Sequence, residues 1–578
     1  MTRRGMAVHV VTTRRHYHGK VYETHLLRRS YRDGRTVRNE TLANLSHLPA
    51  HVIDLVRRAL RGETLRPVEE TFAVVRSPHH GHVHAILQSM ERLGFASLVA
   101  SRPSHQRDLV IALVAARVLA PSSKLATTRW WQTTTLPELL GVETATEDEL
   151  YEAMDWLLER QGVIEKKLAA RHLREQGLVL YDLTSSYFEG VTCPLAAFGH
   201  NRDGKRGKRQ VNYGLLTTAG GVPVSVSVFA GNTADPKTLL PQVTTVRERF
   251  GIQRVVLVGD RGMICQTQIT ELAKLTGIEW ITALRSEAIR TLVEQGQIQL
   301  GLFDERNLVE ITHPDYPGER LVACRNPELA TARAAKRQAL LAATAKELDM
   351  VCRMAGRGRL KGQAAIGVRV GKVVNKYKVA KHFLLDIQAD RFTYRLDDTS
   401  VAAEAALDGL YVIRTSVPPT RMEAAEVVRS YKQLSTVERA FRAYKTIDLK
   451  VRPIHHRLEQ RVRAHIFLCM LAYYVQWHMI EAWRPLLFCD EDQQAKQTRD
   501  PVAPAKRSAA ALDKVYSKQL DDGSVVHSFR TLLAELSTIV RNVCRTPSAD
   551  AEAPTFHVIT EPNAKQAHAL RLLATITV

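Results

Sequence analysis

The sequence lacks any segment long enough to cross a membrane and any cysteine pattern that would hold a fold together. A membrane-spanning helix needs about 20 mostly apolar residues, whereas the longest apolar run, His465 to Ile480, is interrupted by Gln476 and His478. The N-terminus has no apolar stretch of signal-peptide length. The seven cysteines are scattered, odd in number and include no Cys-x-x-Cys pair, which argues against disulfide bonds and a structural zinc site. We therefore expect a protein of the reducing cytoplasm.

Acidic residues are scarce relative to basic ones. The 578 residues include 81 lysines and arginines but only 60 aspartates and glutamates, which leaves a formal net charge of +21. This surplus indicates a polyanionic partner, and we expect nucleic acid, with the protein associated with the nucleoid. The composition, 45% hydrophobic and 24% charged, is that of a globular protein, so a disordered chain, a collagen-like repeat and a coiled-coil rod are excluded. The length predicts about three to five domains.

The hydrophobic pattern changes twice along the chain. Residues 7–46 alternate polar and apolar side chains, as short strands do, and residues 1–40 carry ten basic residues against three acidic ones. From about 84 to 176 apolar residues recur at helical spacing. Strands and helices then alternate, which predicts an α/β fold with a mixed sheet whose faces are covered. The expected strands lie at 178–182, 211–218, 222–231, 254–260, 278–285 and 408–416, and the expected helices at 237–250, 266–276, 421–445 and 457–482.

The alternation is interrupted between about 287 and 405. Residues 298–321 and 365–387 have the pattern of strands, and residues 330–354 that of a helix. We predict that 287–405 is an insertion subdomain that protrudes from the sheet and contacts DNA through basic residues. The basic residues expected to contact DNA include Arg333, Lys336 and Lys361.

Two aspartates each close an apolar strand pattern: Asp182 ends LVLYD and Asp260 ends VVLVGD. Strand ends hold functional side chains rigidly and in reach of solvent, although an aspartate there also caps turns in many proteins. Carboxylates that converge need a cation, and hard oxygen ligands select Mg²⁺ or Mn²⁺. Two such ions would clamp the attacking and leaving oxygens of a phosphoryl displacement. Together with the net charge, this pattern favours metal-assisted cleavage and joining of DNA or RNA.

A third carboxylate, Glu438, lies on the helix predicted at 421–445. Tyr431, Glu438 and Lys445 recur every seven residues and so share one helix face. A solvated, ion-paired face is the simpler interpretation of the same spacing. Thr420 and Glu423 form a capping-box pattern that predicts where this helix begins.

Several segments resemble a known family: YDLTSSYFEG, GHNRDGKRGKRQVNYGLLTTAGGVPVSVSVFAGNTADPKTL, VLVGDRGMI, YKQLSTVERAFRAYKT and RPIHHRLEQRVRAHIFLCMLAYYV. They are similar to the DDE transposases of bacterial insertion sequences, in the IS-four-like superfamily and most closely its sixteen-thirty-four group. The resemblance extends from about Phe72 to the C-terminal ALRLLATI. It implies an RNase H-like core that holds an Asp–Asp–Glu triad, with a β-rich insertion between the second Asp and the Glu.

The resemblance also implies roles for individual residues. Asp182, Asp260 and Glu438 match the catalytic, metal-binding triad, which would hold two Mg²⁺ (or Mn²⁺) ions. Tyr431 and Lys445 match a Tyr–Arg–Glu–Lys signature that binds phosphates of the transposon end. Leu434 stands at the position of the signature Arg, so that contact either comes from elsewhere, with Arg439 and Arg442 as candidates, or is absent. A basic loop, suited to phosphate contacts or simply to solubility, contributes Lys205, Arg206, Lys208 and Arg209.

We therefore expect a transposase that binds terminal inverted repeats, cleaves DNA and joins the freed end to target DNA, as a homodimer in the synaptic complex. An RNase H-like nuclease or resolvase without strand transfer, and a catalytically silent DNA-binding descendant of a transposase, are the alternatives. The expected domains are a DNA-end-binding module (1–75), a helical DNA-binding domain (76–176), the first core part (177–286), the insertion (287–405), the second core part (406–485), and a linker with a C-terminal helical region (486–578).

Overall fold

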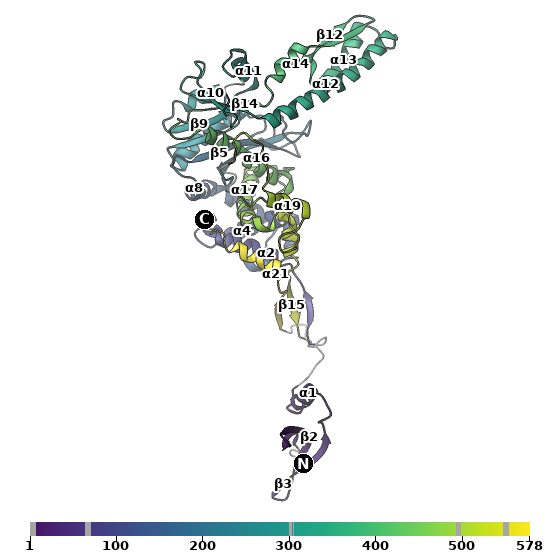
Figure 1. Cartoon of the computed structure of the whole chain (residues 1–578). Coiled ribbons are helices and arrows are strands. Elements are labelled where there is room, and N and C mark those ends of the chain that lie inside the picture. The colour runs from purple at the N-terminus through teal and green to yellow at the C-terminus, as the bar shows by residue number, and fades with distance from the viewer. Residues whose placement is uncertain (1–6, 64–70, 300–302, 305, 493–498, 547–553) are drawn as a thin grey trace. The chain divides into compact units, whose positions relative to one another are not determined.

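The computed structural model describes residues 7–63, 71–299, 303–304, 306–492, 499–546 and 554–578 (Figure 1). The chain divides into two compact units. One consists of Met1–Ser77 and Arg541–Thr560, the other of Pro78–Val540 and Glu561–Val578. How far the six expected domains match this division stays a prediction, and each unit is described by itself.

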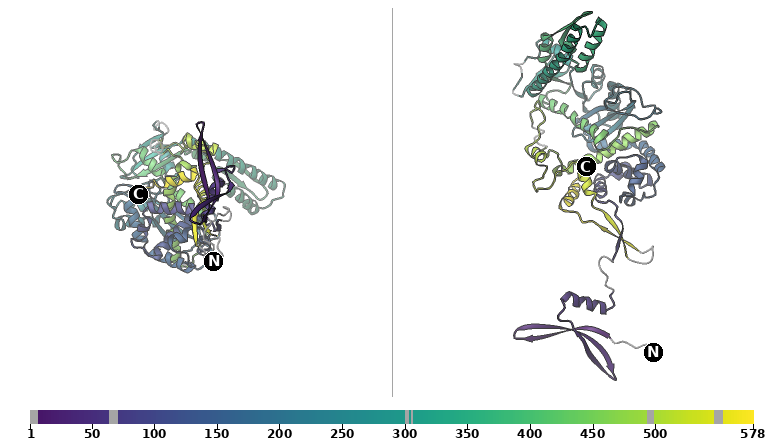
Figure 2. Two further views of the ribbon diagram at one scale, coloured as in Figure 1. Left: turned by 90° about the horizontal axis from the view of Figure 1, so that it is seen from below. Right: turned by 90° about the vertical axis from the view of Figure 1, so that its right-hand side faces the viewer.

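The first unit is built from two small antiparallel sheets and one helix. β1 (Ala7–Tyr17), β2 (Lys20–Asp33) and β3 (Thr36–Asn44) form a three-stranded meander, followed by α1 (Ala50–Leu60) (Figure 2). His18 and Gly19 both have positive φ, 48° and 71°, as a two-residue hairpin turn requires. The second sheet has the order β16–β15–β4, from β4 (Ala73–Arg76), β15 (Arg541–Arg545) and β16 (Thr555–Ile559). The C-terminal region was expected to be linker and helix with a strand near 556–560, which is β16. It also supplies β15, which was not expected because its pairing with β4 joins segments far apart in sequence.

Helices occupy the chain from Gly81 to His172, as their periodicity predicts. The central one, α4, is buried continuously from Leu109 to Val118 and packs against α7 and α17. No single helix in the described residues is long and apolar enough to cross a membrane; α4 and α5 pass that test only as a pair, bent by 91°. The helices are α2 (Gly81–Arg92), α3 (Phe95–Val99), α4 (His105–Leu119), α5 (Lys124–Trp131), α6 (Leu136–Leu140), α7 (Glu147–Glu159) and α8 (Gln161–His172).

The second unit is organised around a mixed eight-stranded sheet of order β10–β11–β14–β9–β8–β5–β6–β7. β5, β6 and β7 form an antiparallel meander, while β5, β8 and β9 run parallel. The fold is therefore α/β with a large mixed sheet, as expected. The strands are β5 (Leu178–Tyr187), β6 (Gln210–Thr218), β7 (Pro223–Ala230), β8 (Val255–Val258), β9 (Ile278–Ala283), β10 (Leu308–Ile311), β11 (Arg320–Arg325) and β14 (Leu410–Thr415).

The prediction for 287–405 is wrong in two respects. β10 and β11 belong to the main sheet, because β11 pairs with β14 along its whole length. Residues 363–377 form helix α13 (Gln363–Tyr377) rather than a strand. Their many valines favour a strand, but Ile366, Val370, Val373 and Val374 are spaced to line one helix face, and they are buried.

The part of this segment with a core of its own begins after β11. α12 (Pro327–Gly356) and α13 lie side by side (Figures 1 and 2) and pack with β12 (Phe383–Ile387), β13 (Phe392–Leu396) and α14 (Asp398–Ala405). Arg333 and Lys336 lie on α12 and Lys361 lies in the segment that joins α12 to α13. DNA contact by this part stays a prediction.

The helix expected at 421–445 is divided. It consists of α15 (Ala424–Lys432), α16 (Leu434–Arg442) and a π-helical turn, η6 (Ala443–Ile447). The predicted capping box is wrong: Glu423 is the N-cap residue and makes no side-chain capping bond. α15 packs on β9 and β14, α16 packs on β5, and the buried α17 (Glu459–Ala482) follows.

Candidate active site

Asp182 and Asp260 lie at the same level on two neighbouring parallel strands. Leu180 of β5 pairs with Val258 of β8, and each aspartate lies two residues further along its segment. A step of two residues returns to the same face of the sheet, and neighbouring strands are about 4.8 Å apart. The sheet therefore brings the two carboxylates together, although 77 residues of sequence lie between Asp182 and Asp260.

The two aspartates differ in their local structure. Asp182 was expected to end its strand, and this prediction is wrong: β5 continues to Tyr187, and Asp182 pairs with Leu215 of β6. Asp260 follows the end of β8 and caps a turn, since its Oδ1 accepts the backbone N–H groups of Gly262 (3.1 Å) and Met263 (2.8 Å). The Oδ1 of Asp182 accepts the N–H of Leu183, at 2.8 Å. Within the described residues no hydrogen bond is found for Oδ2 of either aspartate, so both atoms remain available to a ligand.

Glu438 approaches this pair from α16, which packs on β5. Burial raises the pKa of Asp182 to about 7, and the negative charges of Asp260 and Glu438 contribute to this shift. Burial likewise raises the pKa of Tyr431 to about 12, with Asp260, Glu438 and Asp182 adding to it. Tyr431 and the three carboxylates thus lie close enough to interact electrostatically. Glu438 itself is exposed to solvent.

The carboxylates are neighbours without forming a closed coordination shell. In the described part of the chain, no group of three or more His, Cys, Asp or Glu side chains is close enough to hold a metal ion. The chemistry of the site nevertheless fits a hard divalent cation, because three mutually repelling carboxylates offer oxygen ligands only. A cation would also offset the repulsion that raises the pKa of Asp182.

Two arginines beside the carboxylates were not identified from the sequence. Arg202 lowers the pKa of Asp182 and forms an ion pair with Asp235. Arg261, the exposed residue after Asp260, lowers the pKa of Tyr431. The signal was available, since Arg202 directly precedes the basic loop and Arg261 directly follows a predicted site residue. Both cations can face an anionic substrate at the carboxylates.

Lys445 belongs to a neighbouring ion cluster that the sequence did not reveal. Its ammonium lies 2.9 Å from Oδ1 of Asp203, which also pairs with Arg452. The other oxygen of Asp203 accepts the backbone N–H of Tyr187 at 2.9 Å. The side chain of Asp203 is only 2% exposed. This carboxylate ties the start of the basic loop, the end of β5 and η6 together.

The remaining predicted phosphate-binding residues are distributed around this region. In the basic loop, Lys208 pairs with Glu189 at 2.7 Å and Arg209 donates to the carbonyl of Val191, whereas Lys205 and Arg206 are exposed. Arg439 and Arg442 are exposed on α16. Burial raises the pKa of Tyr473 on α17, and the positive charge of Arg439 partly offsets that rise. Leu434 is buried, at the start of α16.

Comparisons with known proteins identify families to which the chain is similar. The family model described as "Transposase DDE domain" matches residues 190–475. The model described as "IS1634 family transposase, N-terminal domain" matches residues 10–70. The first match includes Asp260 and Glu438 but begins after Asp182. No curated protein matches the chain.

A solved structure with a distant similarity is a cryo-EM structure of a piggyBac transposase synaptic complex with hairpin DNA. The comparison covers 78% of this chain and 76% of that chain, with 9% sequence identity and a TM-score of 0.33. That similarity is too low to transfer residues or geometry from one chain to the other.

The two family models together cover more than half of the chain. The protein is a DDE transposase, an enzyme that catalyses metal-dependent phosphoryl transfer in DNA. Within this class it belongs to the IS1634 family.

Proposed function

We propose that Asp182, Asp260 and Glu438 are the catalytic carboxylates of this transposase. The observation that supports them best is the position of Asp182, whose pKa is raised by burial and by the negative charges of Asp260, its neighbour across the parallel register, and of Glu438 on α16. The strand order β7–β6–β5–β8–β9 supports the RNase H-like core that the family resemblance implies. In that core, β14 returns the chain to the sheet and α15 and α16 deliver Glu438.

The three carboxylates would hold divalent cations, in our proposal two Mg²⁺ or Mn²⁺ ions. When bound, such ions polarise a phosphodiester and stabilise the negative charge that develops on its oxygens. The Oδ1 bonds of Asp182 and Asp260 to backbone N–H groups hold each carboxylate in place and leave its Oδ2 for a ligand. Arg202 and Arg261 would oppose the charge of the DNA strand at this point.

Phosphate contacts around the site would position the transposon end without reading its sequence. Lys205 and Arg206 are exposed and available for this role, and we also assign it to Tyr431, Lys208, Arg209, Arg439 and Arg442. Lys445 is held by Asp203, so its contribution is chiefly to order the loop that carries these cations. Residues 1–75 and 76–176 would recognise the terminal repeats, and two ends would be joined by a homodimer.

The test is cleavage of linear DNA that carries the element's own ends, with Mg²⁺ or with EDTA. Asp182→Asn, Asp260→Asn and Glu438→Gln should each lower cleavage by at least about 10³-fold, because an isosteric amide is a poor ligand for Mg²⁺. End binding should persist in all three. Glu271→Gln, which removes an exposed carboxylate paired with Lys274, is the matched control. Cleavage near the level of the native protein in any one variant would remove that residue from the triad.

A further inference from the structure

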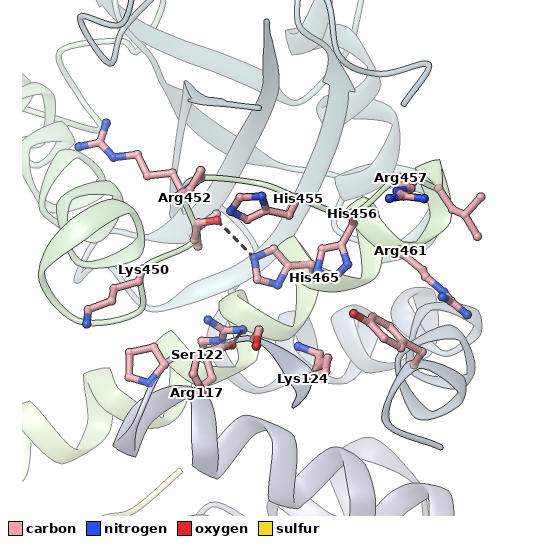
Figure 3. A pocket seen from close by; sticks show the side chains of 16 residues that line it. Arg117, Ser122, Lys124, Lys450, Arg452, His455, His456, Arg457, Arg461 and His465 are labelled. Carbon is pink, nitrogen blue, oxygen red and sulfur yellow. Dashed lines mark hydrogen bonds between the residues drawn. The ribbon is translucent and has the colours of Figure 1, made fainter. Parts of the chain in front are cut away.

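A second charged site lies in the same unit and shares no residue with the carboxylates. It is a cavity of about 680 Å³ between α4 and α5 on one side and the segment from Lys450 to His465 on the other (Figure 3). Basic residues enter it from both sides, and none of the described residues that line it is acidic. The residues that matter most are Arg117, Lys124, His456, Arg457, Arg461 and His465.

Two cations at the base of this cavity are buried without a carboxylate. Lys124 is 3% exposed and Arg117 is 7% exposed. Among the residues that the structure describes, Arg117 donates only to backbone carbonyls, those of Ser122 (3.1 Å) and Leu449 (3.4 Å). For Lys124 no hydrogen bond or ion pair is found in the part of the chain that the structure describes. Burial, reinforced by the charge of Arg117, lowers the pKa of Lys124 to about 7.

Two histidines complete the wall opposite these cations. His465 is 5% exposed, and its Nε2 donates to the carbonyl of Val451 at 3.3 Å. Its Nδ1 is buried with no hydrogen-bond partner. The ring of His456 lies 4.9 Å from that of His465, and Figure 3 shows both rings above Lys124 and Arg117. Burial and the neighbouring cations hold the pKa of both histidines well below the ordinary value.

A buried ammonium among other cations is unfavourable unless an anion joins it. The donors present, which are guanidinium, ammonium and imidazole groups, suit the oxygens of a phosphate. The guanidinium of Arg461 is held over the ring of Tyr151, at 4.6 Å, and 3.6 Å from Asp155, while Arg457 is exposed beside it. The cavity is as large as those that enclose whole small ligands, so a phosphate can enter with the group attached to it.

We propose that this cavity binds a phosphate group of DNA together with its attached nucleotide, as a second DNA contact besides the carboxylate site. The inference rests on the chain being a transposase, because the phosphate groups available to a protein that acts on DNA are those of the DNA strand. The positive charges of Arg117 and Lys124 form the base of the phosphate site, and Arg457 and Arg461 guide the strand into it. Binding of the anion supplies the partner that the buried groups lack.

The test uses the full-length protein and Lys124→Met, with Lys274→Met as a control that removes one exposed positive charge elsewhere. Melting is measured with and without inorganic phosphate, and binding of a fluorescent duplex that carries the transposon end is measured by anisotropy. We expect Lys124→Met to melt at the same or a higher temperature than the native protein when no ligand is present. It should lose the rise in melting temperature that phosphate causes, and it should bind the duplex about 10-fold more weakly.

Other outcomes overturn the proposal. If Lys124→Met melts several degrees lower and binds the duplex as the native protein does, Lys124 is structural. If phosphate and deoxynucleoside monophosphates stabilise the native protein through Lys124 but affinity for the duplex is unchanged, the cavity takes a soluble phosphate compound rather than DNA. Arg457→Gln, at an exposed position, repeats the measurement without a buried substitution. The carboxylate variants Asp182→Asn and Glu438→Gln should keep the Lys124-dependent binding, so failure here is distinguishable from failure of the triad.

Discussion

The carboxylate site and the cavity at Lys124 carry opposite charges, but each holds charges of one sign close together without enough charge of the other sign to balance them. At the first, Asp182 sits beside Asp260 and Glu438, and burial and repulsion raise its pKa to about 7. At the second, Lys124 sits beside Arg117, and burial and repulsion lower its pKa to about 7. Each site gathers like charges on a folded scaffold. Each would be relieved by a ligand of the opposite sign, a divalent cation in one case and a phosphate in the other.

In the cluster at Asp203, in the same unit, positive and negative charges are paired with each other. The side chain of Asp203 is also buried, but it contacts Lys445 and Arg452 and accepts a backbone N–H from Tyr187. No cation is missing there, and none is needed from outside. We infer that balanced charges hold the structure together, whereas the two groups of unbalanced charges are where we propose that ligands bind.

The largest effect on stability should come from the balanced cluster. Asp203→Ala would leave two cations, Lys445 and Arg452, without their carboxylate, and we expect a loss of about 3–5 kcal/mol in the free energy of unfolding. Urea denaturation measures it. Glu271→Ala, at a carboxylate that is 43% exposed and paired with Lys274, is the control and should cost far less. Equal stability of the native protein and Asp203→Ala would mean that this cluster does not hold the loop.

Patterns in the sequence were sufficient to predict the three carboxylates, but not the tertiary contacts that surround them. Asp182 and Asp260 were found because they follow apolar strand patterns, and Glu438 because of its heptad spacing and its family resemblance. The Asp203 cluster joins residues more than 240 positions apart, and the cavity joins 117–124 to 450–465. Such contacts follow from tertiary packing, which no local pattern encodes. For the same reason the pairing of β11 with β14 was missed.

Acid should destabilise the protein through buried neutral histidines. Burial lowers the pKa of His172 to about 4 and that of His478 to about 3. Between the ordinary value of about 6.5 and these values the unfolded chain binds more protons than the folded one, so stability falls as the pH falls. From pH 7 to 5 each histidine should cost about 1 kcal/mol, after discounting for partial exposure. His478→Gln should show a smaller loss over this range than the native protein; an identical loss would contradict the assignment.

Removal of a charge from the unbalanced carboxylates should stabilise the protein, whereas removal of Asp203 should destabilise it. With EDTA present at pH 8, Asp182→Asn removes a repelled charge, so we expect it to be more stable than the native protein by about 1 kcal/mol. Addition of Mg²⁺ should stabilise the native protein and have little effect on the variant. Thermal melting measures both effects. A destabilised Asp182→Asn in EDTA would show that Asp182 is needed for the fold and would weaken the contrast drawn above.

The smallest effect concerns the basic loop, where a paired and an unpaired cation can be compared directly. Lys208 is joined to Glu189 at 2.7 Å, whereas Arg206 is exposed two residues before it. A cation that contacts a phosphate releases counterions from DNA, so its removal lowers the slope of log affinity against log salt by about 0.9. We expect this decrease for Arg206→Gln and a smaller one for Lys208→Gln, because Lys208 must first leave Glu189. Equal slopes for the two variants would mean that the Lys208–Glu189 pair does not limit contact with DNA, and an unchanged slope for both would place the loop away from the DNA.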